Sequence, residues 1–142
     1  MSQTTVEIRT VAGGSLAVGS SGPRTVTIDR SKEAGGLGLG FNGGELLLLA
    51  IGGCYSNDIY REAAKRGLKV QDVRVKVTAD WGGEPVRAQN VCFSVTVEGE
   101  AAAEEIRDLI HYTDTVAEIP NSLRLGTEVK LTETEIISSG VR

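Results

Sequence analysis

The chain has 142 residues, of which 40% are hydrophobic and 24% charged, and its formal net charge is −4. This length fits one unit with a hydrophobic core, so we expect residues 1–142 to form a single domain. An acidic chain without a cluster of Lys and Arg is a poor match for nucleic acid. A membrane span is not expected either, because the longest apolar run, Leu46 to Ile51, is far too short.

Cysteine and histidine usage indicates a reducing compartment and no metal site. Met1 to Thr10 lacks the charged start and apolar core of a secretory signal, so we expect a cytoplasmic location with free thiols. The two cysteines, Cys54 and Cys92, lie too far apart for a metal knuckle or a CxxC motif, and His111 is the one histidine. We therefore expect neither a metal nor a cofactor.

Short strands separated by turns are predicted for the first part of the chain. Apolar residues alternate with polar ones in Val6–Thr10, Leu16–Val18 and Arg24–Arg30. The glycines and proline between these segments, in Gly13-Gly14 and Ser20–Pro23, are typical of turns. Together the segments predict an antiparallel meander.

The central segment is predicted to be a long helix that follows a glycine-rich loop. The loop, residues 35–44, contains the spacing GxGxxG at Gly38, Gly40 and Gly43. A dinucleotide site also needs a strand directly before the loop and a parallel βαβ series, and neither is predicted here. We expect the loop only to let the chain turn tightly into a helix that runs from Glu45 to about Arg66, with a glycine after its end.

The first half of this helix is apolar on every side, from Leu46 to Ile51. Such a helix must be covered on every side, whereas its second half, from Asn57 onward, is amphipathic. The rest of the chain, with one smaller helix, offers too little cover. A partner subunit would supply it, so we predict an obligate homodimer.

Two longer strands, two short helical segments and a final strand complete a single α+β unit. Alternating apolar residues in Val70–Ala79 and Val91–Val97, on either side of a Trp81–Gly83 turn, predict antiparallel strands with one buried face. An amphipathic helix is predicted for Ala101–His111, and Pro120 is expected to open a helical turn around Asn121–Arg124. A final strand is predicted from the apolar residues Val129, Leu131, Ile136 and Ile137.

Cys54 is the principal candidate for a reactive group. It follows Gly52-Gly53 near the middle of the predicted helix, where each glycine costs about 1 kcal/mol relative to alanine. Two missing side chains beside a sulfur leave space for a substrate or for another backbone. A packed core cysteine accounts for the same position, because cysteine is among the most buried residue types. Both interpretations stay open.

Three further residues are candidates for a role near this thiol. Glu45 is either a first-turn partner of the helix dipole or an acid near the thiol pocket. Cys92 lies on the polar face of its strand, which favours a plain exposed thiol, and a Cys54–Cys92 disulfide depends on geometry. His111 could serve as a base for Cys54 in a hydrolase or transferase, although a histidine at a helix end is more often a cap or a surface residue.

Two stretches resemble the signature of the OsmC/organic hydroperoxide resistance family. The first is the glycine-rich loop with Gly44-Glu45-Leu46-Leu47-Leu48-Leu49-Ala50-Ile51-Gly52-Gly53-Cys54, which is similar to the family pattern P-x-E-L-L-L-A-A-L-G-A-C. The second is Ala117-Glu118-Ile119-Pro120-Asn121-Ser122, which resembles the family's A-x-C-P-x-S. The similarity spans about residues 24 to 131.

This resemblance implies an antiparallel sheet wrapped around a long buried central helix, in an intertwined homodimer with its site at the subunit interface. It also implies thiol-dependent reduction of organic hydroperoxides, in which one cysteine attacks the O–O bond and becomes a sulfenic acid that a second cysteine resolves. In the family an Arg and a Glu activate the first thiolate.

Carried over by position, the match is partial. Cys54 falls on the attacking position, but Ile119 falls on the resolving one, so an external thiol or Cys92 would have to resolve a sulfenate. Glu45 fits the glutamate of the broader pattern, whereas the hydroperoxide-specific branches place it one residue earlier. Arg9 and Arg24 are the candidates for the activating arginine.

The leading functional hypothesis is thiol-dependent peroxide reduction in oxidative stress, with Cys54 and Glu45 as catalytic residues, a homodimer, and an external thiol as reductant. The alternative is a non-catalytic relative whose interface cleft binds a small apolar ligand.

Overall fold

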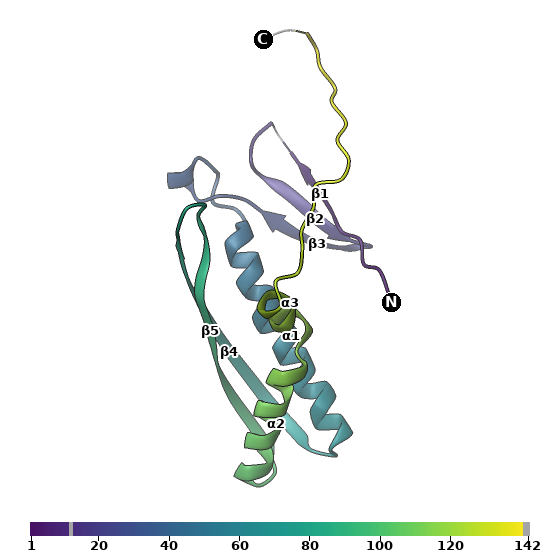
Figure 1. Ribbon diagram of the computed structural model, residues 1–142, viewed down its shortest axis with the longest axis vertical. Helices are drawn as coiled ribbons and strands as arrows, with labels where there is room; N and C mark the ends of the chain where they lie inside the picture. Colours follow the sequence, from purple (N-terminus) through teal and green to yellow (C-terminus); the bar gives the residue numbers. More distant parts are fainter. Residues whose placement is uncertain (12, 141–142) are drawn as a thin grey trace.

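The computed structural model describes residues 1–11 and 13–140. An N-terminal sheet of three antiparallel strands comes first, in the order β1 (Glu7–Thr10), β2 (Ala17–Ser21) and β3 (Arg24–Ile28). It confirms the predicted meander. In Figure 1 this sheet lies beyond the N-terminal end of α1, apart from the packed helices and the long hairpin.

Asp29 organises the glycine-rich loop that joins this sheet to the central helix. Its buried carboxylate accepts hydrogen bonds from Ser15 Oγ and from the backbone N–H groups of Arg30, Leu37 and Leu39. Burial disfavours the charged carboxylate, but these four hydrogen bonds outweigh that cost and hold the pKa of Asp29 below its ordinary value.

The loop's backbone lies so close to the end of the sheet that a side chain has no room at two of its glycines. A Cβ atom would lie 2.2 Å from the Arg30 carbonyl oxygen at Gly36, and 2.4 Å from the Thr27 carbonyl oxygen at Gly40. The glycines therefore permit a tight turn, as expected from the sequence. A short 3₁₀ helix, η1 (Lys32–Ala34), lies within the turn.

Helix α1 (Gly43–Lys65) is the long central helix, and it begins two residues before the predicted start. Asn42 is its N-cap: the Asn42 side chain accepts a hydrogen bond from the Glu45 N–H at 2.8 Å, and Glu45 accepts one from the Asn42 N–H at 3.0 Å. Gly67, with φ of 65°, follows the helix end in the left-handed region that glycine adopts without strain.

A long antiparallel hairpin packs against one side of α1. Its strands are β4 (Lys69–Gly82) and β5 (Arg87–Glu100), which run past the predicted bounds at both ends. The apolar faces carry Val73, Val75, Phe93, Val95 and Val97 toward the core. The strict alternation of the sequence thus places one face inward, as predicted.

Two helices cover another side of α1, as Figure 1 shows. Helix α2 (Ala103–Val116) begins two residues after the predicted start and ends five residues after the predicted end. Helix α3 (Glu118–Arg124) begins before Pro120 rather than at it. The first turn of a helix has N–H groups without helical partners, so a proline lacking this group fits there.

The predicted final strand is wrong, because residues 127–139 belong to no helix or strand. Their apolar side chains are exposed, at 94% for Val129 and 86% for Leu131. A strand needs a neighbouring strand to satisfy its backbone, and within the described residues this segment pairs with none.

The core of the single chain is centred on the second half of α1. Tyr55, Ile59 and Ala63 are buried with Leu109 of α2 and Ala117 before α3. The Tyr55 hydroxyl donates to the Ile110 carbonyl oxygen at 2.7 Å. In the apolar first half, by contrast, one face is open to solvent, and Leu49 is 53% exposed. No helix in the described ranges has both the length and the apolar character to cross a membrane.

Candidate functional site

Cys54 lies half-buried in the middle of α1, on the side that faces α3. Asp58 follows it by four residues, and helical geometry places residues at this spacing on the same face. The Cys54 thiol donates a hydrogen bond to Asp58 Oδ2 across 3.8 Å. The candidate nucleophile therefore has a buried carboxylate as its direct neighbour.

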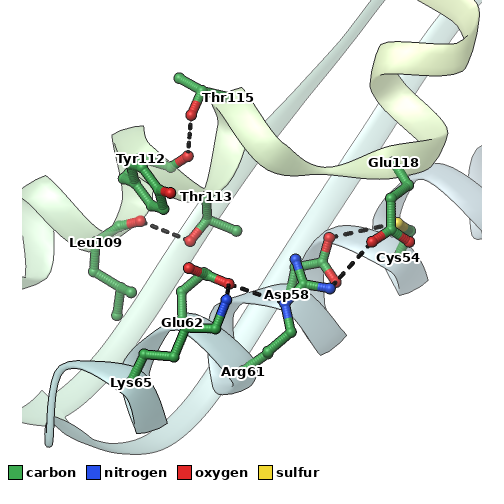
Figure 2. Close-up of polar contacts among 10 residues, drawn as sticks. All are labelled: Cys54, Asp58, Arg61, Glu62, Lys65, Leu109, Tyr112, Thr113, Thr115 and Glu118. Atoms are coloured by element: carbon green, nitrogen blue, oxygen red, sulfur yellow. Dashed lines mark hydrogen bonds and ion pairs between the residues drawn. The ribbon is translucent and has the colours of Figure 1, made fainter.

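Arg61 lies one turn further along the same face and binds three carboxylates. Its Nη1 lies 3.1 Å from Asp58 Oδ1 and 3.1 Å from Glu118 Oε1 of α3, and its Nε lies 2.9 Å from Glu62 Oε2. Hydrogen bonds to Glu62 and to Glu118 raise the pKa of Arg61 above its ordinary value. Arg61 is thus a permanent cation within the group of residues around Cys54 (Figure 2).

Glu62 extends this network away from the thiol. Its buried carboxylate also binds Lys65 Nζ at 3.0 Å. Hydrogen bonds from Arg61 first, and then from Lys65, hold the pKa of Glu62 below its ordinary value despite burial. The pairing compensates the cost of burying this charge and fixes the position of the Arg61 side chain.

Helix α3 brings the second family-like motif to Cys54. The Cys54 sulfur and one carboxylate oxygen each of Asp58 and Glu118 lie within 4.8 Å of one another. Ile119, at the position of the expected resolving cysteine, is the next residue along the chain. A sulfur and two carboxylates could hold a metal ion, but the Arg61 guanidinium already binds both carboxylates and would repel a cation.

Glu45 lies apart from this network within one chain. It precedes Cys54 by nine positions on α1, which corresponds to about 13.5 Å along the helix axis. Its carboxylate completes the N-terminal cap of α1, so the structure supports the first-turn interpretation. Glu45 also lines the open groove described below.

The other candidates are not brought to Cys54 either. Arg9 and Arg24 lie on β1 and β3 of the N-terminal sheet. Cys92 is an exposed free thiol on β5, 3.1 Å from Thr78 Oγ1, and Cys54 is also free. His111 lines a cavity of about 410 Å³ together with Cys92, and Cys54 is not part of that lining.

An apolar groove runs along the open face of α1 beside β4. Its volume is about 470 Å³. The groove exposes side chains at successive turns of the helix and the inward valines of the strand, namely Phe41, Glu45, Leu48, Leu49, Gly52, Gly53, Ser56, Val73, Val75 and Val77. The two glycines before Cys54 thus open onto this groove.

Sequence reasoning missed Asp58, Arg61 and Glu118. The first two carried a readable signal, because they follow Cys54 at i+4 and i+7 on the predicted helix and so share its face. Glu118 carried none, since its approach depends on how α3 packs on α1.

Comparison with known proteins identifies the family. Residues 35–132 match the family described as OsmC-like protein. No curated protein sequence matches the chain significantly.

Solved structures with the same fold are many. An OsmC-like protein from Mycoplasma pneumoniae has a TM-score of 0.76 at 16% identity, covering 89% of each chain. An organic hydroperoxide resistance protein from Legionella pneumophila has a TM-score of 0.60 at 16% identity, over 87% of this chain and 90% of that one. Another, from Elizabethkingia anophelis with thiocyanate bound, has a TM-score of 0.60 at 19% identity, over 89% and 91%.

These similarities confirm the antiparallel α+β fold, and the family match spans more than half of the sequence. The chain belongs to the OsmC-like protein family.

Proposed function

We propose that this protein is a thiol peroxidase that reduces organic hydroperoxides through Cys54 in the response to oxidative stress. The observation that carries the proposal is the position of Cys54: it lies in the middle of the central helix, half-buried, with Glu118 of the second motif beside it. The Legionella and Elizabethkingia relatives, described as organic hydroperoxide resistance proteins, support the same substrate class.

The proposed chemistry uses one cysteine. The Cys54 sulfur attacks the terminal oxygen of a hydroperoxide, the O–O bond breaks, and Cys54 becomes a sulfenic acid while the substrate leaves as an alcohol. Ile119 offers no thiol for the next step, and Cys92 is not among the groups beside Cys54. Two molecules of an external thiol would therefore reduce the sulfenic acid to the thiol and water, forming their own disulfide.

The functional unit in this proposal is a homodimer. The groove along α1 leaves Leu49 and other apolar side chains in water, although the sequence of this half-helix suits a buried one. The C-terminal tail, residues 127–139, carries four more exposed apolar residues, Val129, Leu131, Ile136 and Ile137. Large contiguous apolar surfaces on a folded chain mark interaction sites, and a second copy of the chain offers matching ones.

The test follows peroxide consumption by the reduced protein, with cumene hydroperoxide and hydrogen peroxide as oxidants and dithiothreitol or a dihydrolipoyl compound as reductant. Wild type and Cys92→Ser are expected to turn over and to form a sulfenate on Cys54 that mass spectrometry detects. Cys54→Ser is expected to be inactive. Absence of both turnover and sulfenate in the wild type would refute the peroxidase proposal.

The open groove supports a second candidate function, the binding of a small apolar ligand. Its lining is dominated by Leu, Val, Phe and Gly, and its volume of about 470 Å³ is in the range of small-molecule sites. Calorimetric titration of Cys54→Ser with apolar carboxylic acids and alcohols separates the two functions. Binding to this variant, together with no peroxide reaction in the wild type, would favour the ligand-binding role.

A further inference from the structure

Asp58 is a buried carboxylate whose two oxygens face different partners. Oδ2 accepts the Cys54 thiol proton in a hydrogen bond at 3.8 Å, and Oδ1 pairs with Arg61 Nη1 at 3.1 Å. Its side chain is only 7% exposed, whereas that of Arg61 is 41% exposed. A buried charge is costly unless it is paired and hydrogen-bonded. The ion pair with Arg61 stabilises the buried charge of Asp58, so the contact of Oδ2 with the Cys54 sulfur is not needed for that purpose.

We propose that Asp58 is the acid–base catalyst of the Cys54 reaction, an inference that rests on the proposed peroxidase function. Asp58 Oδ2 accepts the thiol proton, and the thiolate sulfur forms a bond to the terminal oxygen of the hydroperoxide. The O–O bond breaks, Cys54 carries the S–OH group, and the departing alkoxide takes the proton from Asp58. The carboxylate is restored, one hydroperoxide has become one alcohol, and the sulfur has been oxidised by two electrons.

The need for such a group follows from the leaving group. An alkoxide is a poor leaving group unless a proton reaches it as the O–O bond breaks, and a positioned acid–base group contributes about 100- to 10,000-fold to such transfers. Among the described side chains around Cys54, Asp58 is the one that hydrogen-bonds to the sulfur. Glu45, the acid expected from the family pattern, caps the start of the same helix instead.

Arg61 is the positioning residue of this arrangement. Its Nη1 binds Asp58 of α1 and Glu118 of α3 at equal distances of 3.1 Å, so it joins the two helices beside the sulfur. With Oδ1 held by this contact, Oδ2 stays directed at Cys54 (Figure 2). The further contact of Arg61 with Glu62, which Lys65 also binds, fixes the guanidinium from the opposite side.

The experiment compares two reactions of the same thiol in reduced Cys92→Ser protein. Oxidation by cumene hydroperoxide needs a proton at the leaving oxygen, whereas alkylation by iodoacetamide releases iodide and needs none. Asp58→Asn keeps the size of the side chain but cannot accept the proton. Loss of the base slows both reactions alike, because both need the thiolate, whereas loss of the acid slows oxidation alone. We therefore expect the ratio of the oxidation rate constant to the alkylation rate constant to fall at least about 10-fold.

Further variants keep the test decisive. Asp108→Asn removes an exposed acid from α2 and is expected to change neither rate. Circular dichroism shows whether the amide of Asp58→Asn disturbs folding. If it does, Asp58→Ser, whose side chain is smaller and still polar, is expected to show the same selective loss of oxidation. Arg61→Met is expected to lower the ratio of the two rates, and Arg61→Lys to restore most of it.

The outcomes separate this inference from the function on which it rests. If the ratio of the two rate constants is unchanged in Asp58→Asn and Asp58→Ser, Asp58 delivers no proton to the leaving oxygen, and the inference is wrong while the peroxidase proposal stands. If the wild-type thiol is alkylated but never oxidised by the hydroperoxide, both the inference and the proposed function are wrong.

Discussion

Gly53→Ala distinguishes a chain that works alone from one that pairs along α1. A Cβ built at Gly53 meets no atom within 4 Å in the single chain, and the position is an ordinary helical one. Alanine stabilises a helix interior by about 1 kcal/mol relative to glycine. If the chain functioned as a monomer, the substitution would raise its stability by about this amount, or its Tm by roughly 2–5 °C.

In the proposed homodimer the same change acts in the opposite direction. Gly53 opens onto the groove that the second copy would fill. An inserted methyl group in a packed contact costs about 1–3 kcal/mol, and a two-fold interface holds two such groups. Since every 1.4 kcal/mol is about tenfold in affinity, the Kd of the dimer should rise at least about 10-fold.

Sedimentation equilibrium and urea unfolding at several protein concentrations measure both effects. Gly43→Ala is the matched control, because its Cβ also meets nothing within 4 Å and Gly43 does not line the groove. A Gly53→Ala protein that gains about 1 kcal/mol at every concentration and associates like the wild type would refute the dimer along this face.

Two further predictions concern the stability of the fold. Because the pKa of Asp29 is held low in the folded state, its contribution to the free energy of unfolding should be present at neutral pH and be lost as the pH falls below about 4. Asp29→Asn should therefore lower the urea midpoint at pH 7 and make that midpoint less dependent on acid pH. An unchanged loss of stability between pH 7 and acid pH would contradict this assignment. Ile59→Ala should cost about 2–5 kcal/mol, because Ile59 is 0% exposed in the core. Leu125→Ala, at a residue that is 86% exposed, should change the free energy of unfolding by less than about 0.5 kcal/mol, and equal losses in the two variants would contradict the described core.

The elements that the sequence predicted well are those whose partners lie in the same chain. The alternation in β4 and β5 was readable because each strand supplies the other's hydrogen bonds and both rest on α1. The N-terminal meander is local for the same reason, with neighbours joined by short turns. Periodicity is a reliable guide where the covering surface comes from nearby residues.

Periodicity predicts less well for the C-terminal tail and for the first half of α1. The alternating residues after Thr127 satisfy the pattern of a strand, yet among the described residues they pair with no strand. Leu46 to Ile51 satisfy the pattern of a helix buried on all sides, yet one face is open. Both sequences specify an apolar environment, and neither specifies which molecule provides it.

The residues of the candidate site likewise differ in whether local spacing in the sequence predicts their proximity. Cys54, Asp58 and Arg61 share one helical face, so their proximity follows from spacing alone. Glu118 reaches them from α3, 57 residues after Arg61, through packing that no local pattern encodes. The family resemblance points to Arg9 and Arg24 as activating arginines, whereas Arg61, a cation near Cys54 among the described residues, lies on the same helix as the thiol.

That origin changes what the arginine can do. One Nη1 atom of Arg61 is shared between two carboxylates, and Nε is taken by a third. Its charge is therefore already compensated, and it faces Cys54 through Asp58 rather than directly. A cation in that position stabilises the base beside the sulfur more than the sulfur itself. In the proposed mechanism Arg61 therefore holds Asp58 in place, and Asp58 moves the proton that the leaving alkoxide of a hydroperoxide needs and the leaving iodide of an alkylating agent does not.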